Sequence, residues 1–220
     1  QQNTTLFMTL LASFTILLSR YSRQEDICVG SPIANRTHRH TEDLIGFFAN
    51  TLVLRTKIDN SRNFTELLQQ TRQICLDAYT HQDIPFESLV EEISPQRSLS
   101  HTPLFQVMFV LQNSPPSNPA IPNLEINRIE NNSPTARFDL VLEAVEQEGQ
   151  FLLNWNYATD LFKRETIQNM AEHFEVLLQG IINDSNRPIH QLPILTEFEQ
   201  RRFLEWSQTT KNYSRDKSIV

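Results

Sequence analysis

Two hydrophobic patterns alternate along the chain, and this alternation limits the folds that it can adopt. Apolar residues recur at helical spacing around 4–20, 64–80 and 163–182, as one face of a helix requires. Strand-like apolar or alternating runs lie between and beside these stretches: DICVGSPIA, FFANTLVLRTKI, FQVMFVLQN, LEINRI, RFDLVLEAVEQ and FLLNWNY. Helices that alternate with strands predict an α/β fold, in which an open mixed sheet is covered by helices in a two-layer sandwich.

Size and charge exclude several classes of protein. The chain has 220 residues, 39% of them apolar, which is enough for one large domain or two small ones. A net charge of −7 argues against nucleic acid as a partner, because duplex binding depends on clustered Lys and Arg. The apolar run LFMTLLASFTILL has 13 residues, whereas a membrane span needs roughly 20. The preceding QQNTT carries no charge, unlike a signal peptide. We expect a buried core helix here and no membrane contact.

The cysteines and histidines predict neither a disulfide nor a metal site. Cys28 and Cys75 lie far apart among apolar residues, which favours buried free thiols and a reducing, cytoplasmic compartment. His38 and His40 have no further His or Cys at structural-zinc spacing. The chain also lacks a G-x-S-x-G elbow and a glycine-rich phosphate loop.

Both ends of the sequence have the character of cut ends. The chain begins without methionine, already close to an apolar helix, and ends on SIV without a helix stop. We therefore expect a piece of a longer protein.

The stretch HQDIPFE, residues 81–87, follows the amphipathic helix and predicts a corner between two helices. Asp83 can accept a backbone N–H at the start of the second helix, and Pro85 suits its first turn. Glu87 adds a negative charge that is favourable near a helix N-terminus. Capping explains Asp83 and Pro85, but it does not explain His81.

Two further segments place polar residues in apolar surroundings. IGFFANTLVLR carries Asn50 and Thr51 within an apolar strand. Such an amide needs hydrogen bonds, so we expect Asn50 to be buried or nearly so and bonded to the backbone of a neighbouring segment. RSLSHTPLF compresses polar residues against Pro103 and the strand that follows it.

Together these segments resemble the fifth, sixth and seventh core motifs of the condensation domains of nonribosomal peptide synthetases. The fifth, [IV]-G-x-F-V-N-T-x-x-x-R, is matched by Ile45, Gly46, Phe48, Asn50, Thr51 and Arg55, with Ala49 in place of Val. The sixth, [HN]-Q-D-x-P-F-E, is matched throughout by His81, Gln82, Asp83, Pro85, Phe86 and Glu87. The seventh, R-D-x-S-R-N-P-L, is matched only by Arg97, Ser100, Pro103 and Leu104.

The resemblance implies half of an enzyme. The family has two lobes of chloramphenicol-acetyltransferase-like topology, with the active site in a tunnel between them. Its catalytic motif, H-H-x-x-x-D-G, belongs to the N-terminal half, and this chain contains no adjacent histidines. The resemblance therefore implies a C-terminal lobe, residues 1–191, without catalytic residues of its own and inactive alone. Residues 192–220 resemble the linker that leads to an adenylation domain.

The resemblance also implies site residues and partners. It places Asn50, Arg55, His81 and Gln82 on the tunnel wall and gives a structural role to Gly46, Asp83, Pro85, Glu87, Arg97 and Pro103. For His81 two interpretations remain open: a residue that closes a helix, or a tunnel residue that helps to position thioester or amine. The implied partners are the N-terminal lobe, a downstream adenylation domain and peptidyl carrier domains, whose 4′-phosphopantetheine arms deliver the substrates. The chain itself is expected to bind no cofactor.

Three functions remain open at this point. The first is half of a condensation domain, which joins carrier-bound aminoacyl or peptidyl thioesters. The second is a lobe of a related epimerisation domain or coenzyme-A-dependent acyltransferase. The third is a non-catalytic docking or packing module. A half-domain should expose an apolar face near Asn50, Arg55, His81 and the proline-rich segment 113–123, because its partner would cover that face.

Overall fold

The computed structural model describes residues 3–36, 39–42, 44–93, 102–112, 136–147 and 149–208. The helices are α1 (Leu6–Ser22), α2 (Arg39–Glu42), α3 (Phe64–Thr80), α4 (Phe86–Ile93), α5 (Arg164–Asn183) and α6 (Glu197–Ser207). The strands are β1 (Asp26–Ile33), β2 (Asn50–Lys57), β3 (Val107–Gln112), β4 (Leu140–Gln147) and β5 (Gln150–Tyr157). The predicted strand LEINRI, Arg97 and the proline-rich segment lie outside the described residues.

The strands form one mixed sheet in the order β2-β1-β3-β4-β5. The outer pairs β1–β2 and β4–β5 are antiparallel, whereas β1–β3 and β3–β4 are parallel. The strand β4 turns into β5 at Gly149, whose φ of +77° is one that glycine adopts without strain. The prediction of an open mixed sheet covered by helices is confirmed.

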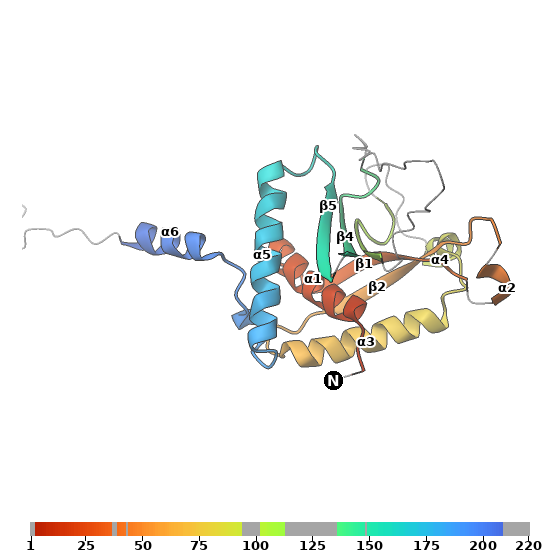
Figure 1. Ribbon diagram of the computed structural model, residues 1–220, viewed down its shortest axis with the longest axis horizontal. Coiled ribbons are helices and arrows are strands. Elements are labelled where there is room, and N and C mark those ends of the chain that lie inside the picture. Colours follow the sequence, from red (N-terminus) through yellow and green to blue (C-terminus); the bar gives the residue numbers. More distant parts are fainter. Residues whose placement is uncertain are drawn as a thin grey trace, which may run out of the picture.

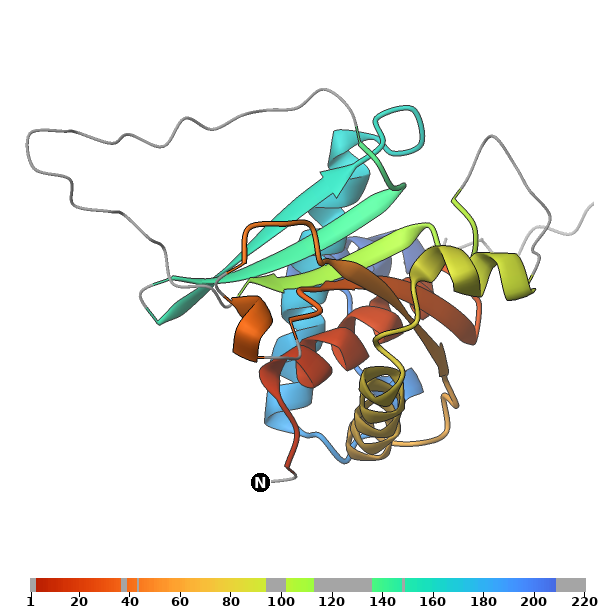
Figure 2. The ribbon, with the colours of Figure 1, turned by 90° about the vertical axis from the view of Figure 1, so that its right-hand side faces the viewer.

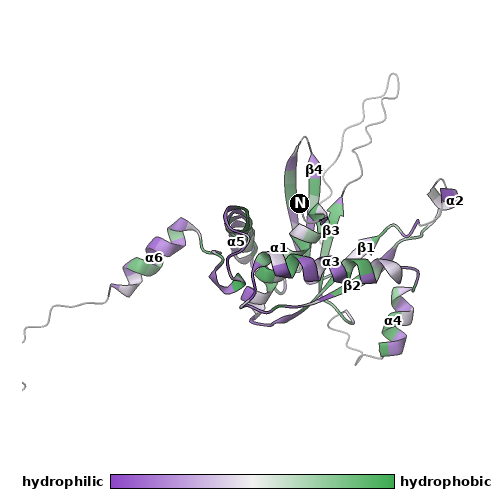
Figure 3. Cartoon of the chain, turned by 90° about the horizontal axis from the view of Figure 1, so that it is seen from below, coloured by the Kyte–Doolittle hydropathy of each residue, from purple (hydrophilic) through white to green (hydrophobic). Residues whose placement is uncertain are grey.

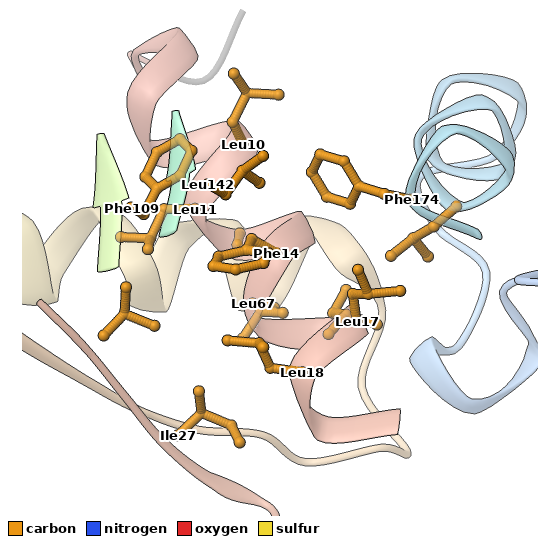
Figure 4. Close-up of a cluster of buried hydrophobic side chains, with 14 of the residues drawn as sticks. Leu10, Leu11, Phe14, Leu17, Leu18, Ile27, Leu67, Phe109, Leu142 and Phe174 are labelled. Atoms are coloured by element: carbon orange, nitrogen blue, oxygen red, sulfur yellow. The ribbon is translucent and has the colours of Figure 1, made fainter. Parts of the chain in front are cut away.

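The core lies between the sheet and α1, which contacts both α3 and α5 (Figures 1 and 2). Phe14 of α1 is fully buried, and its ring centroid lies 6.0–6.2 Å from those of Phe109, Trp155 and Phe174. Figure 4 shows Phe14 among leucines of α1, Leu67 of α3 and Leu142 of β4. Aromatic pairs at these spacings add favourable contacts to the burial of their area. One dry core thus joins three helices to the sheet.

Helix α1 is the buried core helix that the sequence predicted. Its buried polar residues bond within their own helix, Ser13 Oγ to the Thr9 carbonyl at 2.9 Å and Thr15 Oγ1 to the Ala12 carbonyl at 2.8 Å. These bonds remove the cost of burying a hydroxyl group. Within the described residues, no helix has the length and apolarity needed to cross a membrane.

The C-terminal segment is anchored before it leaves the domain. It was predicted as extended, but Ile189–Gln191 forms a 3₁₀ turn. Ile189 and Leu192 are buried in the core, and Arg20 donates to the Ile189 carbonyl at 2.6 Å. Helix α6 then extends away from the body, on the side opposite α2 (Figures 1 and 3), and none of its residues is buried. Its predicted capping box is present.

Candidate functional site

Asn50 joins two of the sequence segments that carry the resemblance. Its Nδ2 donates to the carbonyl oxygens of Gln82 at 2.8 Å and Ile84 at 2.7 Å, and its Oδ1 accepts from the Phe86 backbone N–H at 3.1 Å. The predicted hydrogen bonding to a neighbouring backbone is therefore confirmed, although the residue is half-buried rather than fully buried. One amide at the first position of β2 fixes the whole corner between α3 and α4.

The start of α4 differs from the prediction made for Asp83. Pro85 immediately precedes the helix, and its carbonyl accepts from the Leu89 N–H at 3.2 Å. The first free N–H, that of Phe86, is capped by Asn50, and no hydrogen bond joins Asp83 to another described residue. The assignment of Asp83 as the cap was wrong, because a side chain from the sheet occupies that role. Glu87 does lie in the first turn.

The corner is also pressed against the sheet by aromatic rings. Phe86 lies 5.6 Å from Phe105, and Phe105 stacks at 5.6 Å on Phe138. A Cβ on Gly30 of β1 would lie 2.2 Å from the Phe105 ring. The missing side chain at Gly30 therefore allows this ring to lie directly on the strand.

His81 follows the last residue of α3 and is exposed. Its N–H bonds to the Ala78 carbonyl at 3.1 Å, and its Nδ1 lies 2.9 Å from the Asp77 carbonyl and from Thr80 Oγ1. Because a carbonyl can only accept, the bond to Asp77 requires a proton on Nδ1. In the neutral ring Nε2 is then an acceptor, and it has no partner among the described residues.

Arg55 is held by an acid on the neighbouring strand. Its Nε and Nη2 donate to the two carboxylate oxygens of Asp26 at 2.8 and 2.6 Å. The hydrogen bond from Arg55 lowers the pKa of Asp26. Both side chains are exposed, so this paired arrangement is open to solvent and to a ligand.

A groove of about 1070 Å³ runs past this ion pair. It has an apolar lining with Asp26, Arg55 and Tyr21 among its polar groups. Its walls come from α1, β1, β2, α4 and α5, represented by Leu18, Cys28, Val53, Leu89, Ile93 and Met170. Asn50, His81 and Gln82 are not among the lining residues. The structure therefore brings Asn50 and Gln82 into contact and leaves Arg55 in a separate groove.

The remaining motif residues have mixed outcomes. Gly46 accepts from Arg36 Nη2 at 3.3 Å, and a Cβ on it would meet the Phe48 ring at 3.0 Å. The Pro103 carbonyl accepts from the Phe105 N–H at 2.9 Å. Both observations fit structural roles. Arg97 lies outside the described residues.

The thiols agree in part with the sequence prediction. Both cysteines are free. Burial raises the pKa of Cys75 to about 11, as expected for an inert core thiol. Cys28 is half-buried at the groove rather than in the core.

Sequence reasoning missed a polar chain that ties α6 to the body. Tyr21 Oη lies 2.7 Å from His173 Nδ1, and His173 Nε2 lies 2.8 Å from Glu199 Oε2. Burial, followed by the charge of Glu199, raises the pKa of Tyr21 to about 12. The available signal was the position of His173 on the apolar face of α5, three residues after Met170 and next to Phe174.

The fold is that of chloramphenicol-acetyltransferase-like condensation domains. It is similar to the X-domain from teicoplanin biosynthesis, with a TM-score of 0.81 and 24% identity over 88% of this chain and 45% of that chain. It is also similar to the condensation domain of the Monacolin K polyketide synthase MokA, with a TM-score of 0.76 and 21% identity over 86% and 44% of the respective chains.

The family follows from sequence. The condensation domain model matches residues 1–204, and the chain belongs to the condensation domain family. Over its whole length it is 44% identical to part of the linear gramicidin synthase of Brevibacillus parabrevis and 39% identical to part of tyrocidine synthase 3 of the same organism. The chain spans 4% and 3% of the lengths of these two nonribosomal peptide synthetase chains.

Proposed function

We propose that this chain is the C-terminal half of a condensation domain and forms one wall of the cleft in which a nonribosomal peptide synthetase makes a peptide bond. The observation that carries the proposal is the contact of Asn50 with the 82–86 corner, which unites two condensation motifs in one place. The coverage of 44–45% of the solved relatives supports a half-domain. So does the absence of adjacent histidines from the sequence.

The reaction would be an acyl transfer between two carrier-bound substrates. The acceptor amine attacks the donor thioester carbon, the C–S bond breaks, and the proton lost by the amine goes to the released thiol. The 4′-phosphopantetheine thiols belong to peptidyl carrier domains, and the histidine motif belongs to the N-terminal lobe. This chain supplies positioning groups, and orientation of two bound reactants can lower a barrier substantially.

We assign positioning roles to Asn50, Gln82, His81 and Arg55. Asn50 holds the backbone of Gln82, and the corner carries His81, whose Nε2 has no partner in the described part of the chain and suits an amine N–H. Arg55 offers a cationic group in the groove, preorganised by Asp26.

The proposed boundaries are residues 1–191 for the lobe and 192–220 for a linker toward an adenylation domain. Leu192 is the last buried residue in the described part of the chain. The following helix α6 leaves the body and exposes Phe198 and Trp206. We further propose a cytoplasmic location, which the two free thiols support.

The proposal is tested in the uncut condensation domain with carrier-loaded donor and acceptor. His81→Ala should lower kcat more than it lowers stability, because a helix-terminal histidine contributes only ~0.3–1 kcal/mol through the dipole. His81→Asn, which the motif permits, should restore turnover. His190→Ala is the matched control, since His190 is also exposed and its Nδ1 also lies 2.9 Å from a carbonyl oxygen, that of Asn60.

Two results would contradict this assignment. One is loss of folding in His81→Ala with unchanged turnover by the folded fraction, which would make His81 structural. The other is dipeptide formation by this chain alone near the rate of the uncut domain, since general acid–base help is typically worth ~10²–10⁴ in rate. An epimerised aminoacyl product instead of a dipeptide would indicate the related epimerisation domain.

A further inference from the structure

Two bulky apolar side chains are fully open to solvent just before the candidate site. Ile45 and Phe47 lie between α2 and β2, and Phe47 is 93% exposed while Ile45 is completely exposed. Leu44 beside them is exposed as well. Burying one such side chain is worth roughly 1.5–3 kcal/mol. Scattered exposed apolar residues are ordinary, but neighbouring ones of this size mark an interaction surface.

The backbone that carries these side chains is held in place by Arg36. Its Nη1 donates to the Leu44 carbonyl at 2.9 Å, and its Nη2 donates to the Gly46 carbonyl at 3.3 Å. Its Cζ also lies 4.5 Å from the centroid of the Phe48 ring, within the range of a cation–π contact. Phe48 is thus partly covered, while its neighbour Phe47 is left exposed.

This arrangement is organised before any partner binds. A segment fixed by side-chain bonds loses less entropy on association than a loose one. Gly46 fits the same interpretation, since a Cβ there would press on the Phe48 ring at 3.0 Å. We call residues 44–47 the docking segment.

The docking segment borders the candidate site. It ends three residues before Asn50, the first residue of β2. Ile84, whose carbonyl lies 2.7 Å from Asn50 Nδ2, is exposed too. Figure 3 shows α2, which precedes the segment, at the end of the molecule farthest from α6. Apolar exposure therefore gathers where the corner meets β2.

We propose that Ile45 and Phe47 are the anchors through which this chain packs against the other half of its condensation domain. The solved relatives supply the occupant, because this chain accounts for only 44–45% of their length. The inference rests on the proposed function and specifies the contact surface within it. Packing of the missing half on the docking segment would place it directly beside Asn50 and the 82–86 corner.

Hydroxyl-radical footprinting compares this chain with the uncut condensation domain. Phe47 should be oxidised rapidly in this chain and at least fivefold more slowly in the uncut domain. Phe198 of α6, exposed to 67%, is the internal control and should be oxidised at similar rates in both. Equal oxidation of Phe47 in the two proteins would overturn the proposal.

A second measurement uses the double variant Ile45→Ser with Phe47→Ser. In the uncut domain it should lower Tm by about 2–4 °C or more, whereas in this chain it should leave Tm unchanged, because these side chains have no packing to lose. Phe198→Ser should change neither. An unchanged Tm of the uncut domain in the double variant would contradict the proposal.

The two proposals fail separately. If the uncut domain protects Phe47 but makes no dipeptide, the proposed function fails and the docking surface stands. If dipeptide forms while Phe47 remains equally open, the docking surface fails and the proposed function stands.

Discussion

The helix-covered face of the sheet and the end of the molecule at α2 are built in opposite ways. On the helix-covered face, α1, α3 and α5 bury a continuous set of apolar side chains, among them Phe14 and Phe174. At the α2 end, Phe47 is exposed, and the contacts that define the structure are polar ones from Arg36 and Asn50. The first region holds the chain together, whereas the second is fixed in shape but left uncovered.

The largest expected effect comes from opening the core. Phe14→Ala removes a fully buried ring that contacts three other aromatic rings. We expect a loss of ~3–5 kcal/mol in the free energy of unfolding, measured in urea. Phe47→Ala is the matched control at the α2 end and should change the stability of this chain by less than ~0.5 kcal/mol. Similar losses for both variants would erase the contrast between the regions.

A smaller loss should follow removal of the polar anchor. Asn50→Ala leaves the carbonyls of Gln82 and Ile84 and the Phe86 N–H without their partner. Because the site is only half-buried, we expect ~1–3 kcal/mol in urea unfolding. Asn60→Ala removes an exposed amide bonded to Glu25 at 3.1 Å and should cost little. Equal values for the two asparagine variants would show that the corner does not depend on Asn50.

Acid should weaken the attachment of α6. Burial raises the pKa of Glu199, but hydrogen bonds from Thr196 and His173 outweigh it, so the net pKa is lowered. A carboxylate with a lowered folded-state pKa stabilises the protein above its unfolded value, near 4.3, and loses this contribution as pH falls through the folded value.

This contribution is measured as the stability difference between wild type and Glu199→Gln. We expect ~0.5–1 kcal/mol at pH 7, vanishing below about pH 4. Glu197→Gln is the control, because Glu197 has only an exposed pair with Arg201 at 3.3 Å. A difference that persists unchanged at pH 3 would contradict a role for the Glu199 charge.

The smallest effect on stability is expected at Arg55. Its ion pair with Asp26 is exposed on both sides, and such pairs contribute little to folding. Arg55→Ala should leave the urea midpoint of this chain unchanged, while Arg55→Ala in the uncut condensation domain should raise KM for the carrier-bound substrates. A marked fall in the urea midpoint would make Arg55 a structural residue rather than a groove residue.

Local patterns in the sequence were enough to predict the elements but not their contacts. Helical spacing gave α3 from Phe64 to Thr80, and Thr196 with Glu199 gave the start of α6. These features depend on residues three or four positions apart. The cap of α4 was assigned to nearby Asp83, although the structure uses Asn50, 36 residues before Phe86. Pairing of Arg55 with Asp26 similarly depends on the register of β1 with β2.

The Tyr21, His173 and Glu199 chain lay even further from prediction. Its members come from α1, α5 and α6, and no short pattern connects three separate helices. The need for some partner of a polar group on an apolar helix face can be argued from sequence. The identity of that partner depends on the packing angle of the helices, which sequence periodicity does not determine.

The bonds of Asn50 also have a consequence for the order of folding. They connect residues separated by 32 to 36 positions, and the whole of α3 lies between them. Closing a loop of this length costs entropy that local contacts do not repay. The corner with His81 can therefore be completed only after α3 has folded back onto β2. A chain that presents this site has already passed through most of its folding, so the site itself reports a finished lobe.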